Sequence, residues 1–228
     1  MLTALHTRDA FLQELLQAEA TEIERRLYLA FPEPNDDQMI QYLRDDMRLE
    51  NQLFEMALLA RGFANHYRRP DPYQVGVIIV GLRHASPGEN PWAVMFSANT
   101  KPSKNYIKQC GEWWLFEGAL KENGHRTLRR ILAIHVVGEP RADDVSGPQG
   151  VTQITLTPCK ICRDRMWAMS LHAPKMVQAK WTPLIVPTTL VKTADYRNLG
   201  IRKYFRADEL HPFHKEPKAI FSAQAIDD

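Results

Sequence analysis

The chain has 228 residues, which suits one domain with an extension and can bury a sizeable core. Its 29 lysines and arginines nearly balance 27 aspartates and glutamates, so the overall charge predicts no general attraction to nucleic acid or to a membrane surface. The longest apolar run, Val75 to Val80, is far too short to cross a bilayer, so we expect no membrane partner.

Residues 1–70 are predicted to form a helical extension. Apolar residues recur at helical spacing from Phe11 to Leu27 and again from Met39 to Ala57, and the prolines at 32 and 34 break the pattern between them. We therefore expect two helices that form a hairpin. They could serve as a lid or bind a partner. A helical layer that covers a sheet edge or a dimer surface is the favoured interpretation, because amphipathic helices usually just pack.

Residues 71–228 are predicted to form an α/β domain. The run from Val75 to Val80 is rich in β-branched residues, as is typical of a strand covered on both faces. We predict strands at 75–80, 92–97, 131–137, 151–157 and 181–186, and helices at 111–123 and 159–169. The order β-β-α-β-α-β predicts an architecture of three layers.

The three cysteines fall in two short motifs, Cys110-Gly-Glu112 and Pro158-Cys159-Lys-Ile-Cys162. An odd number of cysteines, with two in a C-x-x-C, argues against a disulfide framework and for thiolate chemistry in a reduced compartment. The N-terminus also lacks an apolar signal core, so we expect a cytoplasmic protein.

Cys110, Cys159 and Cys162 are candidate ligands of a zinc ion. Zinc prefers four ligands, so three thiolates would leave one position for water, as in a catalytic site. A structural site would need a fourth protein ligand, and no histidine lies at a suitable spacing. A redox pair would leave Cys110 and Glu112 unexplained. The pattern therefore favours catalytic zinc.

Glu112 is the candidate proton carrier. It lies in the first turn of a predicted helix, two residues after Cys110, and can reach a water on the metal without being a ligand. Zinc lowers the pKa of its water toward neutrality, and a carboxylate can accept that proton and donate it again within one turnover.

C-x-E followed by P-C-x-x-C resembles the motifs of the zinc-dependent cytidine deaminase superfamily, in its three-cysteine branch. The resemblance covers roughly residues 73–217. It implies a three-layer α/β/α domain with a mixed sheet, preceded here by the helical extension. It also implies a hydrolase that replaces the exocyclic amine of a cytosine-like base with a carbonyl and releases ammonia. Relatives in this branch tend to form tetramers, so a homo-oligomer is expected.

The resemblance also assigns substrate contacts. Asn99 lies eleven residues before Cys110, at the family's spacing, and Phe96 would pack on the base. The backbone carbonyl of Thr157 would accept from the exocyclic amine. Arg163 follows the second cysteine of C-x-x-C, where its guanidinium would donate to a thiolate and restore the Lewis acidity of the zinc.

Lys101 departs from the family pattern, which has a glutamate that accepts from ribose hydroxyls. An ammonium has no acceptor capacity, so plain cytidine is not the expected substrate. Lys101 could instead meet a phosphate or carboxylate on a modified nucleoside or nucleotide, or it could simply point to solvent.

Two other functions stay open from the sequence. The protein could deaminate a base within single-stranded RNA or DNA, with a backbone groove lined by basic residues near Arg126–Arg130 and Arg202–Arg206. It could also be a catalytically inactive, zinc-stabilised scaffold whose helical N-terminus binds a protein partner. Glu112 argues against the scaffold, since a structural zinc site does not need a carboxylate there.

Overall fold

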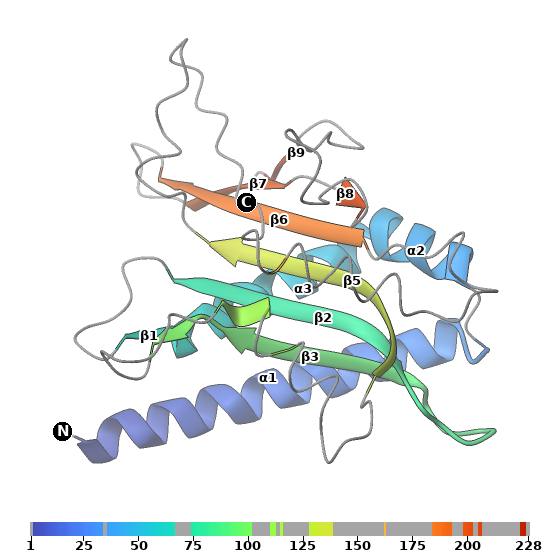
Figure 1. Cartoon of the computed structure of the whole chain (residues 1–228), viewed down its shortest axis with the longest axis horizontal. Helices are drawn as coiled ribbons and strands as arrows, with labels where there is room; N and C mark the ends of the chain where they lie inside the picture. The colour runs from blue at the N-terminus through green and yellow to red at the C-terminus, as the bar shows by residue number, and fades with distance from the viewer. Residues whose placement is uncertain are drawn as a thin grey trace, which may run out of the picture.

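The computed structural model describes the chain in stretches separated by gaps. These are residues 2–33, 36–66, 74–101, 110–112, 115, 128–138, 162, 184–192, 198–202, 205–206 and 224–226. They form a mixed α/β structure in which the helices of residues 2–60 lie on one face of a sheet (Figure 1). No helix within these stretches has both the length and the apolar character needed to cross a membrane.

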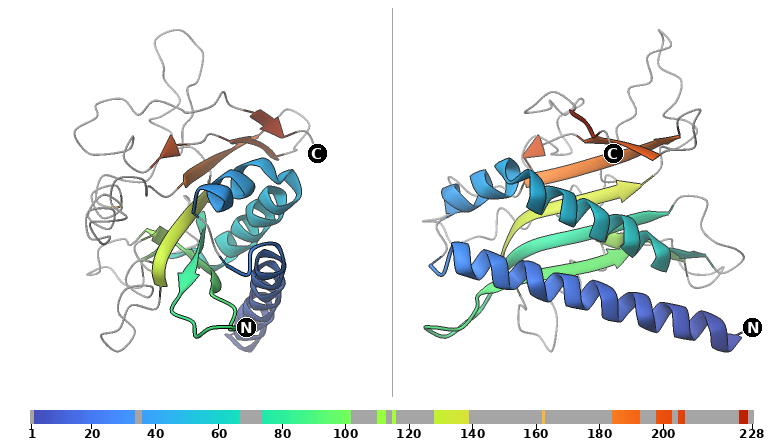
Figure 2. Two further views of the ribbon diagram at one scale, coloured as in Figure 1. Left: turned by 90° about the vertical axis from the view of Figure 1, so that its right-hand side faces the viewer. Right: turned by 180° about the vertical axis from the view of Figure 1, so that it is seen from behind.

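The N-terminal residues form helices, as predicted. The helical elements are α1 (Leu2–Ala30), α2 (Asp36–Asp45), α3 (Met47–Ala60) and the short 3-10 helix η1 (Arg61–Phe63). Seen from behind, α2 and α3 run back antiparallel to α1 (Figure 2). The pattern predicted one helix after the prolines, but the helix breaks at Asp46. The Asp46 carboxylate accepts hydrogen bonds from the backbone N–H groups of Arg48 and Leu49, both at 3.0 Å, and so caps α3.

The described strands form a seven-stranded sheet and a separate two-stranded one. The large sheet has the order β3-β2-β5-β6-β7-β9, and β8 also pairs with β6. Strand β2 is antiparallel to β3 and β5, whereas β5 is parallel to β6, so the sheet is mixed. The strands of the large sheet are β2 (Val75–Arg83), β3 (Trp92–Ala98), β5 (Leu128–Gly138), β6 (Leu184–Lys192), β7 (Asn198–Arg202), β8 (Phe205–Arg206) and β9 (Gln224–Ile226).

The strands predicted at 75–80, 92–97 and 131–137 are confirmed, and each is longer than predicted. The strand predicted at 151–157 lies outside the described residues, as does most of the two helices predicted at 111–123 and 159–169. Within those helices, Gly111, Glu112, Leu115 and Cys162 are helical. The boundary between the two predicted units, near residue 70, also falls outside the described stretches.

Strand β6 overlaps the strand predicted at 181–186 but continues through Pro187 to Lys192. Proline cannot donate to a sheet ladder, so a strand is expected to end before it. In β6, Leu184 and Ile185 pair with β8, whereas Thr188 to Lys192 pair with β7. Pro187 falls between these two partners, and on the other side of β6 it is the register partner of Val136 in β5.

Both faces of β2 are buried, as predicted from its β-branched run. Ile78, Val80 and Leu82 belong to the hydrophobic core that the sheet shares with the helices. Val77 and Ile79 alternate with them and are also fully buried. Since successive strand residues point to opposite faces, α1 to α3 cover one face and other parts of the chain cover the second.

Helix α1 also protects an edge of the sheet. Strand β3 is an edge strand of the described sheet, and its Val94 N–H donates to the Glu24 carboxylate at 2.8 Å. The same carboxylate pairs with Arg83 at the end of β2. The indole N–H of Trp92 donates to the Phe31 carbonyl at 3.1 Å. These contacts make the helical layer part of the sheet's own packing, which agrees with the interpretation favoured from the sequence.

The close approach of α3 to β2 at Gly76 gives the first prediction. A Cβ atom at Gly76 would overlap the backbone carbonyl oxygen of Ala57, and backbone cannot move aside cheaply. We expect Gly76→Ala to lower the free energy of unfolding by at least about 1–3 kcal/mol, measured by urea denaturation. In the control Gly62→Ala, the new Cβ meets the Cδ2 atom of the Leu12 side chain, 2.8 Å away, and a flexible side chain can shift. Equal stability of the Gly76 variant and the unmodified protein would contradict the close packing.

Candidate metal centre

Cys110, Glu112 and Cys162 come together in the structure. Their sulfur and carboxylate oxygen atoms all lie within 4.8 Å of one another. Cys110 is half-buried, whereas Glu112 and Cys162 are buried. The cluster joins two segments far apart in the sequence, one that follows Lys101 and one that precedes β6. Within the described part of the chain, no other group of three His, Cys, Asp or Glu side chains is arranged to hold a metal ion.

Gly111 determines how closely the Cys110–Glu112 segment lies on the sheet. A Cβ atom added there would lie 2.7 Å from Cγ2 of Val77 and 3.2 Å from the backbone carbon of Ala98. Val77 points to the face of β2 opposite the helices, so the Cys110–Glu112 turn lies on that second face. Only glycine allows this contact without displacing the sheet or the turn.

Asn99 is buried beside this turn, at the end of β3. Its side-chain oxygen accepts a hydrogen bond from the Val75 N–H at 2.7 Å, and its own N–H donates to the Val75 carbonyl at 3.2 Å. These bonds hold the end of β3 against the start of β2. Because Ala98 contacts Gly111, the bonds also fix the backbone that supports the cysteine turn. The described contacts thus give Asn99 a structural role next to the site.

Phe96 is not brought to the cluster. Its register partner is Ile78, whose side chain lies in the core under the helices. The Phe96 ring is half-buried and stacks with Phe63 of η1, with centroids 6.4 Å apart and planes 18° apart. This placement favours packing against the helical layer over contact with a base at the cysteines.

Lys101 lies in β4 (Thr100–Lys101), which follows Asn99 directly. This short strand pairs in parallel with β1 (Asn65–His66), so that His66 is the register partner of Lys101. Strand β1, which follows the helices, therefore pairs with β4 next to the site. The sequence pattern did not predict this pairing, because a strand of two residues has no periodicity. Cys159, Thr157 and Arg163 lie outside the described residues.

The chemistry of the three side chains fits a zinc ion. Thiolates are soft ligands that zinc prefers, and two of them beside a carboxylate concentrate negative charge that a divalent cation would offset. A buried carboxylate is costly unless hydrogen bonds or a cation compensate it. The C-x-E spacing puts Glu112 on the turn that carries Cys110, close enough to act on a molecule held there. Two cysteines and one acid thus form a group that could hold a metal ion.

No protein-family model matches the chain, and no curated protein resembles it significantly.

The packing at Gly111 gives the second prediction. We expect Gly111→Ala to push the Cys110 turn off the sheet and to weaken zinc binding at least tenfold. The measurement is the thiolate-to-metal charge-transfer absorption of the Co²⁺-substituted protein, titrated with zinc. In the control Gly62→Ala, the substitution lies against Leu12 in the helical layer and should leave the titration unchanged. Unaltered metal affinity in the Gly111 variant would show that the close contact is not needed for the site.

Proposed function

We propose that this protein is a zinc-dependent hydrolytic deaminase of a cytosine-like base carried on a modified nucleoside or nucleotide. The observation that carries the proposal is the position of the Glu112 carboxylate, within 4.8 Å of the Cys110 and Cys162 sulfurs. A site that served only to stabilise the fold would gain little from an acid in that position. The motif resemblance supplies the reaction class, and the closeness of Glu112 to the two sulfurs supports the proposal.

In this proposal Cys110 and Cys162 hold the zinc together with Cys159. Bound zinc would supply a water whose pKa is close to neutral. Glu112 would take one proton from that water and pass it to the ring nitrogen next to the reacting carbon. The oxygen would bond to that carbon. After a second proton transfer through Glu112, the carbon–nitrogen bond would break, leaving a carbonyl and ammonia.

The proposed architecture is the three-layer α/β/α domain. Its support is that the helical residues Gly111 and Glu112 lie on the face of β2 that α1 to α3 do not cover. The buried Val77 and Ile79 require a cover on that face. A layer of helices that carries the cysteines would provide it.

The remaining assignments belong to the proposal as well. Arg163 would donate to a cysteine sulfur, and the Thr157 carbonyl would receive the exocyclic amine of the base. Lys101 would meet an anionic group on the substrate, from a strand that begins one residue after the buried Asn99. The stacking of Phe96 with Phe63 argues against Phe96 as a contact of the base.

A nucleic-acid substrate has less support. Arg130, one of the basic residues expected to line a backbone groove, is half-buried and is the register partner of Leu82. Leu82 lies in the core under the helices, so Arg130 stands on the face away from the cysteines. Arg130 therefore does not support a nucleic-acid groove beside the cysteines.

Glu112→Gln provides the third prediction, a test of the proposed chemistry. We expect wild-type protein to release ammonia from at least one compound in a panel of cytosine-containing bases, nucleosides and nucleotides. The variant should lose about 100- to 10,000-fold in kcat while still binding zinc, because only the proton carrier has changed. The measurements are ammonia release and zinc content by atomic absorption. Full activity in the Gln variant would refute the role of Glu112.

Lys101 provides the fourth prediction. Replacing the ammonium by a carboxylate restores an acceptor for ribose hydroxyls, so Lys101→Glu should improve kcat/KM for cytidine and reduce it for CMP. Arg48→Glu makes the same change of charge at an exposed position on α3 and should alter neither value. If the ratio of kcat/KM for cytidine to kcat/KM for CMP is the same in the wild type and in Lys101→Glu, the result would argue against an anionic substrate group at this position.

A further inference from the structure

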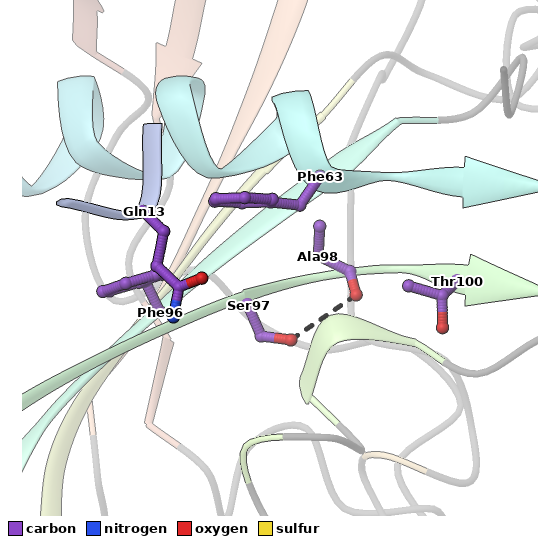
Figure 3. Close-up of a pocket in the computed structure, with 6 residues that line it drawn as sticks. All are labelled: Gln13, Phe63, Phe96, Ser97, Ala98 and Thr100. Atoms are coloured by element: carbon purple, nitrogen blue, oxygen red, sulfur yellow. Dashed lines mark hydrogen bonds between the residues drawn. The ribbon is translucent and has the colours of Figure 1, made fainter. Parts of the chain in front are cut away.

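A pocket lies at the end of β3, and its two aromatic rings are on the side of the sheet that the helices cover. It has a volume of about 390 Å³ and lies between α1, η1 and the end of β3 (Figure 3). Its lining residues are Gln13, Phe63, Phe96, Ser97, Ala98 and Thr100. The volume falls in the range of small-molecule sites, about 300–1,000 Å³. None of the lining side chains carries a charge, so the pocket suits a neutral group.

Two aromatic rings dominate the pocket. Phe63 and Phe96 come from different elements, and their ring planes differ by only 18°. Both side chains are half-buried, so part of each ring still faces outward. Nearly parallel aromatic faces at an open pocket offer stacking surface to a flat ring, which is the usual way that proteins hold a nucleobase without a charge.

Gln13 adds a polar group that can select among flat rings. It is exposed on α1 and lines the pocket together with Phe96 (Figure 3). A carboxamide presents a donor and an acceptor side by side, and this pair matches the N6–H and N7 of adenine. Thr100 lines the other end of the pocket. A few polar groups around an apolar pocket are typical of specific ligand sites.

We propose that this pocket binds the ring of a purine nucleoside, of the adenine type. The ligand stacks on Phe63 and Phe96, and Gln13 contacts the edge of its ring. Since Phe63 and Phe96 pack against the core on the helix side of the sheet, whereas the Cys110–Glu112 turn lies on the other side, the nucleoside is a second ligand and not the substrate.

Adenosine is the probe for this site, and binding to the full-length protein is measured by isothermal titration calorimetry. We expect saturable binding with one adenosine per chain. Phe63→Leu keeps an apolar side chain but removes a stacking face, and should weaken binding about tenfold. The control Phe31→Leu alters a ring that packs on Tyr42 and Trp92, away from the pocket, and should leave the affinity unchanged. Cyclohexanecarboxamide, which has an amide but no aromatic ring, should not compete.

Two further variants keep the test decisive. Gln13 is exposed, so Gln13→Ala should fold normally and should weaken adenosine binding even if Phe63→Leu proves unstable in a thermal melt. Glu112→Gln should bind adenosine with wild-type affinity whether or not the protein is a deaminase. Failure to bind adenosine, or loss of binding in Glu112→Gln with retention in both Phe63→Leu and Gln13→Ala, would overturn the proposal.

Discussion

Backbone packs closely on both faces of the β2–β3 pair, and glycine makes each approach feasible. At Gly76 the backbone of α3 lies so near that a Cβ atom would overlap the Ala57 carbonyl oxygen. At Gly111 the cysteine turn touches Val77 and the Ala98 backbone from the other side. These two contacts set the thickness of the structure around β2. The position of the cluster depends on them, because Cys110 and Glu112 flank Gly111 directly.

The helical layer contributes to this arrangement by fixing the edge of the sheet. Glu24 accepts from the Val94 N–H of the edge strand and pairs with Arg83, while Trp92 donates to the Phe31 carbonyl at the end of α1. An edge strand that is bound by a helix cannot easily pair with another chain. The other end of β3 is held by the Asn99–Val75 hydrogen bonds. Strand β3, whose Ala98 contacts Gly111, is therefore held in place at both ends.

Some of these features are readable in the sequence and others are not. The β-branched run at Val75 predicted a strand covered on both faces, because burial on both faces removes the polar alternation. The break at Asp46 was missed because apolar spacing continues across it, and only the capping hydrogen bonds reveal it. Trp92, Val94 and Phe96 are every second residue of β3 and so point to the same face, and Trp92 and Val94 are buried. Strand alternation could therefore have placed Phe96 under the helices. The need for glycine at 111 has no local signal, since it arises from contact with distant strands.

The same geometry bears on the alternative functions of the N-terminal helices. A lid or a partner-binding arm needs an apolar face that can leave the domain, yet Leu16, Ile23 and Leu27 of α1 are fully or almost fully buried in the core shared with β2 and β3. Lifting α1 away would expose that face and break the bonds of Glu24 to the edge strand. Opening of this kind would cost much of the stability of a domain held by only about 5–15 kcal/mol. The helices are better understood as a fixed layer. One surface of this layer closes the core, and together with the end of β3 the layer lines the pocket that contains Phe63 and Phe96.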